Sequence, residues 1–466
     1  MRDPVRLLSV AVAVAILGAG CQTYKQQANT MTGAWVAGNT ALAAREFGTE
    51  ADKQDKSKDS IIWHLEAGAA YRAAGNYQES NRHLDAAAAR IDEYEQQAKV
   101  KLGREALAAM SNQQNLPYEG RSYDKVMLHT YKALNYLVLG EVDKARPEII
   151  RAYQCQQDAV EENKRRIEKA QETEQQSRDR ANIERTRTDP NLSQSLAGAT
   201  KNLEGFKFYA DYVNPFTVYL DELYFLYAGS GASDLERARK SLNRVQEVAG
   251  DNKFVQADLQ TVERAFNGQA LTPCTYVIFE TGQAASRDQV RIDIPIIVSK
   301  LSYVGAAFPR LVFHRNHAPE LTVKAGEVQE KTSLIANMDA IVALDFKNEW
   351  PVILSKTLIS TVAKAAAAYA VNDAAERQSA LVGLFAKVAT AATQTAMNIS
   401  DTRGWTTLPK EFQVARITTP PDRKLTLSTP GSAPVEVALV DGTVNVVYVR
   451  SITASSPLLV NQFKLK

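Results

Sequence analysis

Cys21 is the residue whose surroundings most clearly suggest a chemical modification. Two arginines precede an uncharged, apolar run at residues 7–17, and small residues lead from that run to the cysteine. A basic start followed by a short apolar run is typical of a secretory signal, and the run is too short for a transmembrane helix. We predict that residues 1–20 are a signal peptide and that Cys21 becomes the first residue of the mature chain.

The segment around Cys21 resembles a bacterial lipobox, although Gly18 stands where a larger apolar residue is commoner. The resemblance implies a covalent diacylglycerol and an N-acyl lipid on Cys21, with residues 21–30 as a lipid-anchored linker. The residue after the cysteine is Gln22 and not an aspartate, which at this position would favour retention in the inner membrane. By resemblance to lipoproteins of Gram-negative bacteria, this favours the outer membrane, with the chain facing the periplasm. The alternative is an ordinary signal peptide with a chance cysteine.

The other reactive residue types give weaker signals. Cys155 and Cys274 could form a disulfide in an oxidising compartment, or they could be two separate buried thiols. His314 and His317 have no third donor nearby, so we interpret them as loop histidines and expect no metal site. The chain has no GxSxG, HExxH, GxxxxGK or GxGxxG motif. We therefore expect a protein that is not an enzyme and needs no cofactor beyond the lipid.

The charge balance gives no indication of nucleic-acid binding. Its 55 basic and 53 acidic residues leave a net charge of +2, and no basic stripe is evident in the sequence. We expect no nucleic-acid partner.

Residues 31–270 have the apolar spacing of helices and predict an all-α domain. Segments 67–89 and 132–154 align, with Gly75 and Gly140 at equivalent turns and small residues where two helices would approach closely. This pattern resembles the tetratricopeptide repeat, which implies stacked helix pairs. A looser third copy covers residues 220–245. Pro147 is expected to kink the second copy.

Residues 154–190 are dense in both charges and poor in large apolar side chains. We predict a charged helical insertion, with a partly disordered segment as the alternative. The aromatic run that follows should begin a helix capped by Asn214, with Pro215 in its first turn.

Residues 271–466 change to short β-branched runs and predict a mixed α+β domain that ends in a small antiparallel sheet. Residues 332–371 are expected to be helix-rich and broken at Pro351, with a second alanine-rich helix at 376–398. Lys364 and Lys387 interrupt the apolar character of these segments, so we predict close packing against the sheet and not membrane insertion. Asp441-Gly442 predicts a hairpin.

The segment 401–409, DTRGWTTLP, offers Asp401, Arg403 and Trp405 as a ligand or partner contact. The alternative is structural: an Asp–Arg pair fixes the turn while Trp405 fills the core.

Three segments at 117–145, 212–226 and 401–409, which follow the lipobox, together resemble an uncharacterised family of bacterial tetratricopeptide-repeat-like outer-membrane lipoproteins. The resemblance implies a role in the cell envelope. It carries over no catalytic residue and no known reaction.

We predict a lipid-anchored scaffold or adaptor that binds another envelope protein or an extended peptide through its helical repeats, and that could form a homo-oligomer. Tyr71, Asn135 and Tyr224 are the candidate groove residues. The alternative function is binding or processing of the cell wall or an exported polysaccharide by the C-terminal domain. Clustered carboxylates would favour it, and Asp293, Asp339 and Asp345 are candidates for such a cluster.

Overall fold

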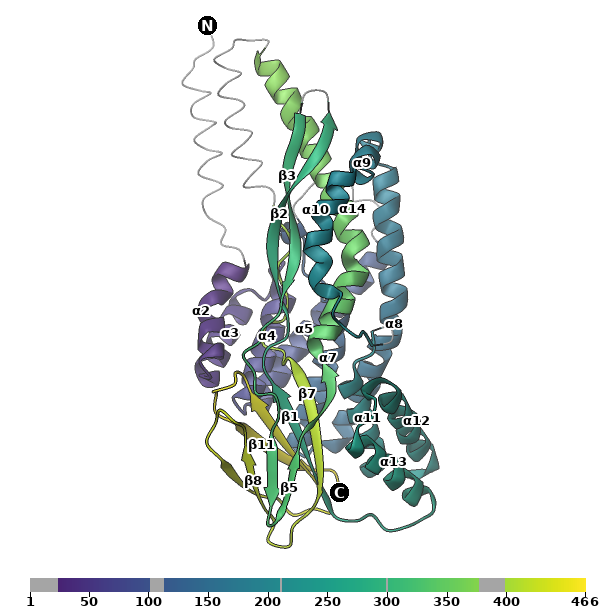
Figure 1. Ribbon diagram of the computed structural model, residues 1–466, viewed down its shortest axis with the longest axis vertical. Helices are drawn as coiled ribbons and strands as arrows, with labels where there is room; N and C mark the ends of the chain where they lie inside the picture. The colour runs from purple at the N-terminus through teal and green to yellow at the C-terminus, as the bar shows by residue number, and fades with distance from the viewer. Residues whose placement is uncertain (1–23, 101–112, 210–211, 299–300, 377–398) are drawn as a thin grey trace.

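A helical half is followed by a strand-rich half, and one long helix from the second half returns alongside the first (Figure 1). The computed structural model describes residues 24–100, 113–209, 212–298, 301–376 and 399–466. The predicted signal peptide, Cys21, Lys387 and nearly all of segment 376–398 lie outside these ranges. Within them, no helix combines the length and the apolar character needed to cross a membrane.

The first helices form antiparallel pairs joined by tight turns. Gly75 and Gly140 have positive φ angles of 78° and 75°, which glycine adopts without strain, so both predicted turns are present. A Cβ on Gly68 would lie 2.6 Å from Leu84, so a small residue is needed where these two helices meet. The tetratricopeptide type of the pairs stays a prediction. The helices are α2 (Tyr24–Val36), α3 (Thr40–Lys53), α4 (Ser60–Ala73), α5 (Tyr77–Val100), η1 (Gln113–Asn115), α7 (Ser122–Val138) and α8 (Val142–Gln175).

Helix α2 occupies most of the segment that we predicted to be a linker. Tyr24 and Ala28 are buried, and the Tyr24 hydroxyl donates a 2.9 Å hydrogen bond to Glu66. The linker boundary at residue 30 is therefore wrong, because Tyr24 already belongs to the helical core.

The charged segment 154–190 is helical over most of its length. Helix α8 continues through Pro147 to Gln175, because a proline near the start of a helix removes only one backbone hydrogen bond. Helix α9 (Arg180–Arg187) then contacts α8, and α10 (Pro190–Thr200) packs against strands of the second half, followed by η2 (Lys201–Leu203). Their opposite charges pair locally, as in the ion pair between Arg187 and Glu174.

The aromatic helix α11 (Pro215–Tyr227) begins where the sequence predicted. The Asn214 side chain accepts hydrogen bonds from the backbone N–H groups of Phe216 and Thr217, at 3.0 and 3.4 Å. Helices α12 (Gly231–Ala249) and α13 (Lys253–Phe266) complete the helical half. Every residue of α11 is buried, so this helix is part of the core on all sides.

The strand-rich half contains two sheets and a separate two-stranded ribbon. The five-stranded sheet has the order β11-β10-β1-β7-β6, in which β10 pairs with β1 in parallel. The four-stranded sheet has the order β5-β4-β8-β9. The strands are β1 (Cys274–Thr281), β2 (Ser286–Val298), β3 (Leu301–Val312), β4 (Thr322–Ala325), β5 (Val328–Lys331), β6 (Ser333–Asn337), β7 (Glu411–Thr418), β8 (Lys424–Ser428), β9 (Val435–Ala438), β10 (Val444–Ser451) and β11 (Leu459–Lys464).

One sequence prediction in this half is wrong, and another holds only in part. Asp441-Gly442 does not close a hairpin, because β9 pairs with β8 while β10 pairs with β1 and β11, so the chain passes from one sheet to the other there. The predicted small antiparallel sheet is present in part, because β8 and β9 lie in an antiparallel sheet with β4 and β5, whereas β7, β10 and β11 join the mixed five-stranded sheet.

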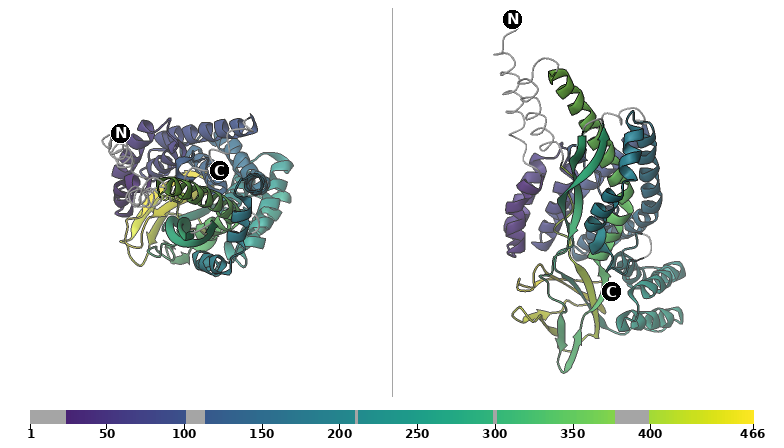
Figure 2. Two further views of the ribbon diagram at one scale, coloured as in Figure 1. Left: turned by 90° about the horizontal axis from the view of Figure 1, so that it is seen from above. Right: turned by 45° about the horizontal axis from the view of Figure 1, so that its top comes forward.

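Helix α14 (Met338–Glu376) is a single helix that continues through Pro351. Residues 333–337 form strand β6, and the Asn337 side chain accepts a hydrogen bond from the N–H of Ala340 where the helix starts. The predicted break at Pro351 is therefore wrong. The first half of α14 packs against the β2–β3 ribbon, α8 and α9, and we call this assembly, together with α10, the stalk (Figures 1 and 2).

Glu222 in α11 is fully buried, and neither of its carboxylate oxygens has a hydrogen-bond partner. Burial raises its pKa well above the usual value, and the neighbouring Asp258 raises it further. The folded protein therefore holds this proton over a pH range in which the unfolded chain releases it.

Because the folded state binds the extra proton, Glu222 makes the free energy of unfolding fall as pH rises above the unfolded pKa near 4.5. We expect Glu222→Gln to match the wild type at pH 4 and to become more stable than it at higher pH, by up to about 1.4 kcal/mol per pH unit. Chemical denaturation at several pH values measures this difference. A difference that does not change with pH would contradict the assignment.

Candidate functional site

A polar groove of about 160 Å³ lies between α5, α7 and α8. Four carboxylates line it, from Asp92 and Glu95 on α5 and from Asp158 and Glu162 on α8, and Lys125 and Arg151 are its cationic residues. The groove is therefore predominantly acidic. It is the surface where two successive helix pairs meet.

The floor of the groove is held by basic residues on one face of α7. Lys125, His129 and Lys132 follow at spacings of four and three residues, which places them on the same side of the helix. The Lys125 ammonium lies 2.6 Å from Glu95 and 2.9 Å from Glu162. Burial opposes its charge, but these two carboxylates raise the pKa of Lys125.

Glu148 on α8 contacts the other two residues of this face. It lies 2.6 Å from both the His129 ring and the Lys132 ammonium. Although burial acts in the opposite direction, these contacts lower the pKa of Glu148. The α7 cations thus connect α5 to α8 and keep the groove in shape, while Asp158 stays exposed at its edge.

The sequence predicted that Tyr71, Asn135 and Tyr224 would line a binding groove of the helical repeats. In the structure all three side chains pack between helices. Asn135 is fully buried and accepts a hydrogen bond from Arg72 at 2.9 Å. Tyr224 is 2% exposed and donates a hydrogen bond to the carbonyl of Val142. Tyr71 is half-buried and stacks on His83, with ring centroids 5.3 Å apart. None of the three lines the α5–α7–α8 groove.

The Asp401–Arg403 pair is a structural contact and not an exposed binding site. Arg403 is 1% exposed, and its guanidinium donates to both oxygens of Asp401, at 2.8 and 2.9 Å. It also donates to Asp59 at 2.7 Å and to the carbonyl of Leu116 at 2.9 Å. The pair therefore fixes the loop against the helical half, as the structural alternative predicted.

Trp405 and the two threonines after it complete this attachment. Trp405 is 2% exposed and packs edge-on against Tyr131, with ring centroids 5.7 Å apart. Thr406 and Thr407 donate four hydrogen bonds to the buried Glu66 carboxylate, two from backbone N–H groups and two from hydroxyls, at 2.7–3.0 Å. Residues 401–408 thus connect the helices to the strand-rich half.

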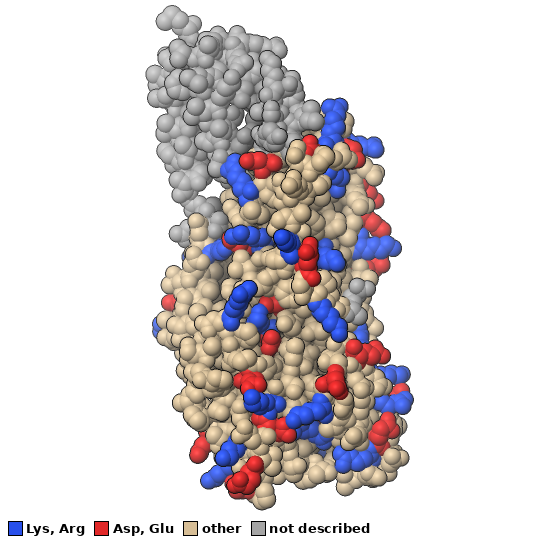
Figure 3. All heavy atoms as spheres, viewed as in Figure 1, with Lys and Arg blue, Asp and Glu red and all other residues tan. Residues whose placement is uncertain are grey.

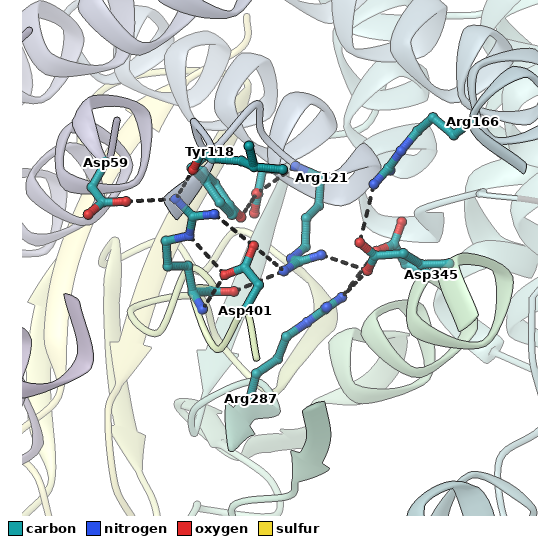
Figure 4. Close-up of polar contacts among 11 residues, drawn as sticks. Asp59, Tyr118, Arg121, Arg166, Arg287, Asp345 and Asp401 are labelled. Carbon is teal, nitrogen blue, oxygen red and sulfur yellow. Dashed lines mark hydrogen bonds and ion pairs between the residues drawn. The ribbon is translucent and has the colours of Figure 1, made fainter. Parts of the chain in front are cut away.

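Glu349 on α14 lies in a charged cluster that the sequence did not reveal. Arg121 and Arg287 each lie 2.7 Å from the same oxygen of Glu349, and Arg166 lies 3.2 Å from the other. Figure 4 shows the three arginines converging on this point from different elements.

The charge state of Glu349 follows from these arginines. Burial alone would raise its pKa, but Arg121, Arg287 and Arg166 hold that pKa well below the usual value. Burial, followed by the repulsion from Glu349, raises the pKa of the adjacent Asp345. The cluster joins α7, α8, β2 and α14 through an ionised Glu349, so its role is to hold the stalk on the helical half.

The remaining candidate residues lie in separate surroundings. Cys155 and Cys274 are free thiols, so the disulfide alternative is wrong in this structure. His314 contacts Ser286 at 3.0 Å, and His317 contacts the carbonyl of Arg315. Across the described ranges, no group of three or more His, Cys, Asp or Glu side chains is arranged to hold a metal ion.

The three aspartates considered for a polysaccharide site have different partners. Asp339 forms an ion pair with Lys410 and accepts a hydrogen bond from the N–H of Ala285. Asp345 faces Arg287 at 3.9 Å, and Asp293 is exposed on β2. These contacts do not describe a pair of catalytic carboxylates that share one cleft.

Comparisons with protein-family models, with curated proteins and with solved structures find no match to this chain.

Proposed function

We propose that this chain is a lipid-anchored scaffold or adaptor of the bacterial cell envelope, which faces the periplasm and binds a partner protein with the α5–α7–α8 groove. The observation that supports the proposal is the groove itself, which is preformed by the ion pairs of Lys125 and lined mainly by carboxylates. A groove between helix pairs suits an extended peptide segment, because successive side chains of the peptide can contact successive helices.

The charges of the groove favour a basic partner segment. Lys125 is already paired with Glu95 and Glu162, and Arg151 lies 3.1 Å from Asp92. Asp158 is exposed at the edge and has no ion pair within the described part of the chain. A lysine or arginine of the partner would therefore meet net negative charge, which favours fast and specific association.

The lipid on Cys21 would confine this binding to one membrane surface. Two residues separate Cys21 from Tyr24, whose side chain is buried in the helical core. An extended segment of this length reaches only about 10 Å, so the helical half would stay next to the membrane. The outer-membrane location and the proposed partner class both belong to this proposal.

A photo-crosslinking amino acid at Asp158, introduced in the native host, tests the proposal. The matched control places the same crosslinker at Val160, which is 47% exposed and lies on another face of α8. We expect one defined partner adduct from position 158 and none from position 160, with the crosslinked partner peptide rich in Lys or Arg. Equal adducts from both positions would contradict binding in the groove.

Charge reversal at the groove edge should weaken the complex with that partner. Asp158→Lys replaces attraction by repulsion for a basic segment, so we expect the dissociation constant to rise about tenfold or more. The same reversal at Glu247, an exposed residue of α12, is the control and should leave affinity unchanged. Calorimetry with the purified proteins measures both values.

A further inference from the structure

A second groove, of about 420 Å³, lies between α10 and the β2–β3 ribbon of the stalk. One wall is formed by the small residues Ser195, Gly198 and Ala199 of α10. The ribbon supplies the other side of the groove, with Arg291 and Asp293 on one face of β2 and Arg310 on the opposite face of the ribbon, where it is paired with Asp288. The volume lies within the range of about 300–1,000 Å³ that is usual for small-molecule sites.

Arg291 and Asp293 present opposite charges from one face of β2. They are two residues apart, so their side chains project from the same side of the strand, about 6.6 Å apart along it. Both side chains are exposed, and neither forms an ion pair with another described residue. Each charge is therefore accessible to a ligand.

Gly305 on the facing strand leaves room for the Arg291 side chain. A Cβ at residue 305 would lie 2.2 Å from the Arg291 Nε, so the guanidinium occupies the space that a side chain there would fill. Gly305 is paired with Asp293 across the ribbon, and the Arg291 side chain runs diagonally towards that pair. The lack of a side chain at residue 305 thus allows the cationic group to lie beside the carboxylate, and among the ion pairs of the described residues none joins the two.

Arg310 connects this groove to the start of the described chain. It lies 3.1 Å from Asp288, which in turn lies 2.9 Å from Lys25 on the first turn of α2. Lys25 is four residues after Cys21. If Cys21 is lipidated as proposed, the groove lies on a part of the stalk close to a membrane surface.

We infer that the groove between α10 and the β2–β3 ribbon binds a zwitterionic phosphate-and-amine group of the phosphoethanolamine type. The Arg291 guanidinium would take the phosphate, because its planar donors match two phosphate oxygens. Asp293 would accept hydrogen bonds from the primary ammonium. A lipid headgroup or a soluble phosphoethanolamine group could supply this chemistry, and the experiment distinguishes the two.

The mature chain, residues 21–466 carrying Cys21→Ser, is tested for co-sedimentation with vesicles, so that the result depends neither on the signal peptide or lipidation nor on the α5–α7–α8 groove. The vesicles are of phosphatidylethanolamine mixed with phosphatidylcholine, or of phosphatidylcholine alone, whose quaternary ammonium cannot donate a hydrogen bond. We expect stronger binding to the first, and about fivefold weaker binding for Arg291→Gln and for Asp293→Asn, because each substitution removes one charge-assisted hydrogen-bonding group. Gly305→Ala should weaken binding as well, because it displaces the guanidinium.

Arg264→Gln is the matched control, since Arg264 is an exposed residue of α13, and this helix lies away from the β2–β3 ribbon at the other end of the molecule (Figure 1). If free phosphoethanolamine binds with the same dependence on Arg291 and Asp293 while vesicles do not, the site stands and its ligand is soluble. The inference is overturned if the Arg291 and Asp293 variants bind like Arg264→Gln. Equal binding to both kinds of vesicle, without binding of free phosphoethanolamine, also overturns it.

Discussion

Glu349→Gln is expected to destabilise the folded protein by about 3–5 kcal/mol. The substitution keeps the side-chain shape but removes the charge that Arg121, Arg287 and Arg166 share. Arg121 and Arg287 are buried, so in the variant each guanidinium would remain charged and shielded from water while its carboxylate partner is lost. A buried charge without a counter-charge destabilises the folded state. Equilibrium unfolding in urea, followed by circular dichroism, measures the loss.

The control for this substitution is Asp52→Asn, which removes a carboxylate from the exposed ion pair with Arg82. Exposed pairs contribute only about 0–1 kcal/mol, so this variant should unfold close to the wild type. Similar losses in the two variants would show that the Glu349 cluster does not join the stalk to the helices in the way the contacts indicate.

Trp405→Ala is expected to cost a similar amount, about 3–5 kcal/mol, for a different reason. The indole is 2% exposed, packs on Tyr131 and donates a 2.9 Å hydrogen bond to the Thr407 hydroxyl. Its removal leaves a cavity next to the threonines that bind Glu66. Calorimetric unfolding of the purified variant tests this expectation.

Trp405→Phe separates packing from hydrogen bonding and should lose less stability than Trp405→Ala, because most of the buried ring remains. A Trp405→Ala variant that keeps wild-type stability but loses its partner would instead restore the binding role first considered for this residue. The two outcomes are distinguished by measuring stability and partner binding on the same preparation.

Local features of the fold were predictable where a few neighbouring residues determine the conformation. Gly75 and Gly140 mark turns because the backbone there needs a positive φ angle, and Asn214 caps α11 through its own side chain. The near-equal numbers of basic and acidic residues in the sequence also agree with the surface, because Figure 3 shows the two kinds of side chain interspersed over the face viewed. Such features need no knowledge of distant contacts.

Features that depend on distant parts of the chain were not predictable. Asp441-Gly442 has the composition of a hairpin turn, but β10 pairs in parallel with β1, about 170 residues earlier. Pro351 did not break α14, since packing against the ribbon and α8 supports the helix around one missing hydrogen bond. Tertiary contacts decided both cases.

The candidate residues were misjudged for a related reason. Aromatic and amide side chains such as Tyr224 and Asn135 were expected in the groove, but in these closely packed helices they fill the space between helices. A usable signal was Glu66, a carboxylate in the otherwise apolar segment IIWHLEAGAAY, since a buried charge requires partners. The partners themselves, at residues 406 and 407, could not be found from spacing.

The most direct test of the proposed scaffold role is a charge-swap binding measurement on the α5–α7–α8 groove. Once crosslinking at Asp158 identifies the partner segment, its contacting lysine or arginine is changed to glutamate, and affinity is measured by calorimetry for all four combinations with wild type and Asp158→Lys. Our account predicts that each single change weakens binding about tenfold or more and that the double change restores most of the affinity. The groove is not the partner-binding site if both single changes leave the affinity unaltered. The same conclusion follows if the loss of binding free energy in the double change equals the sum of the losses in the two single changes.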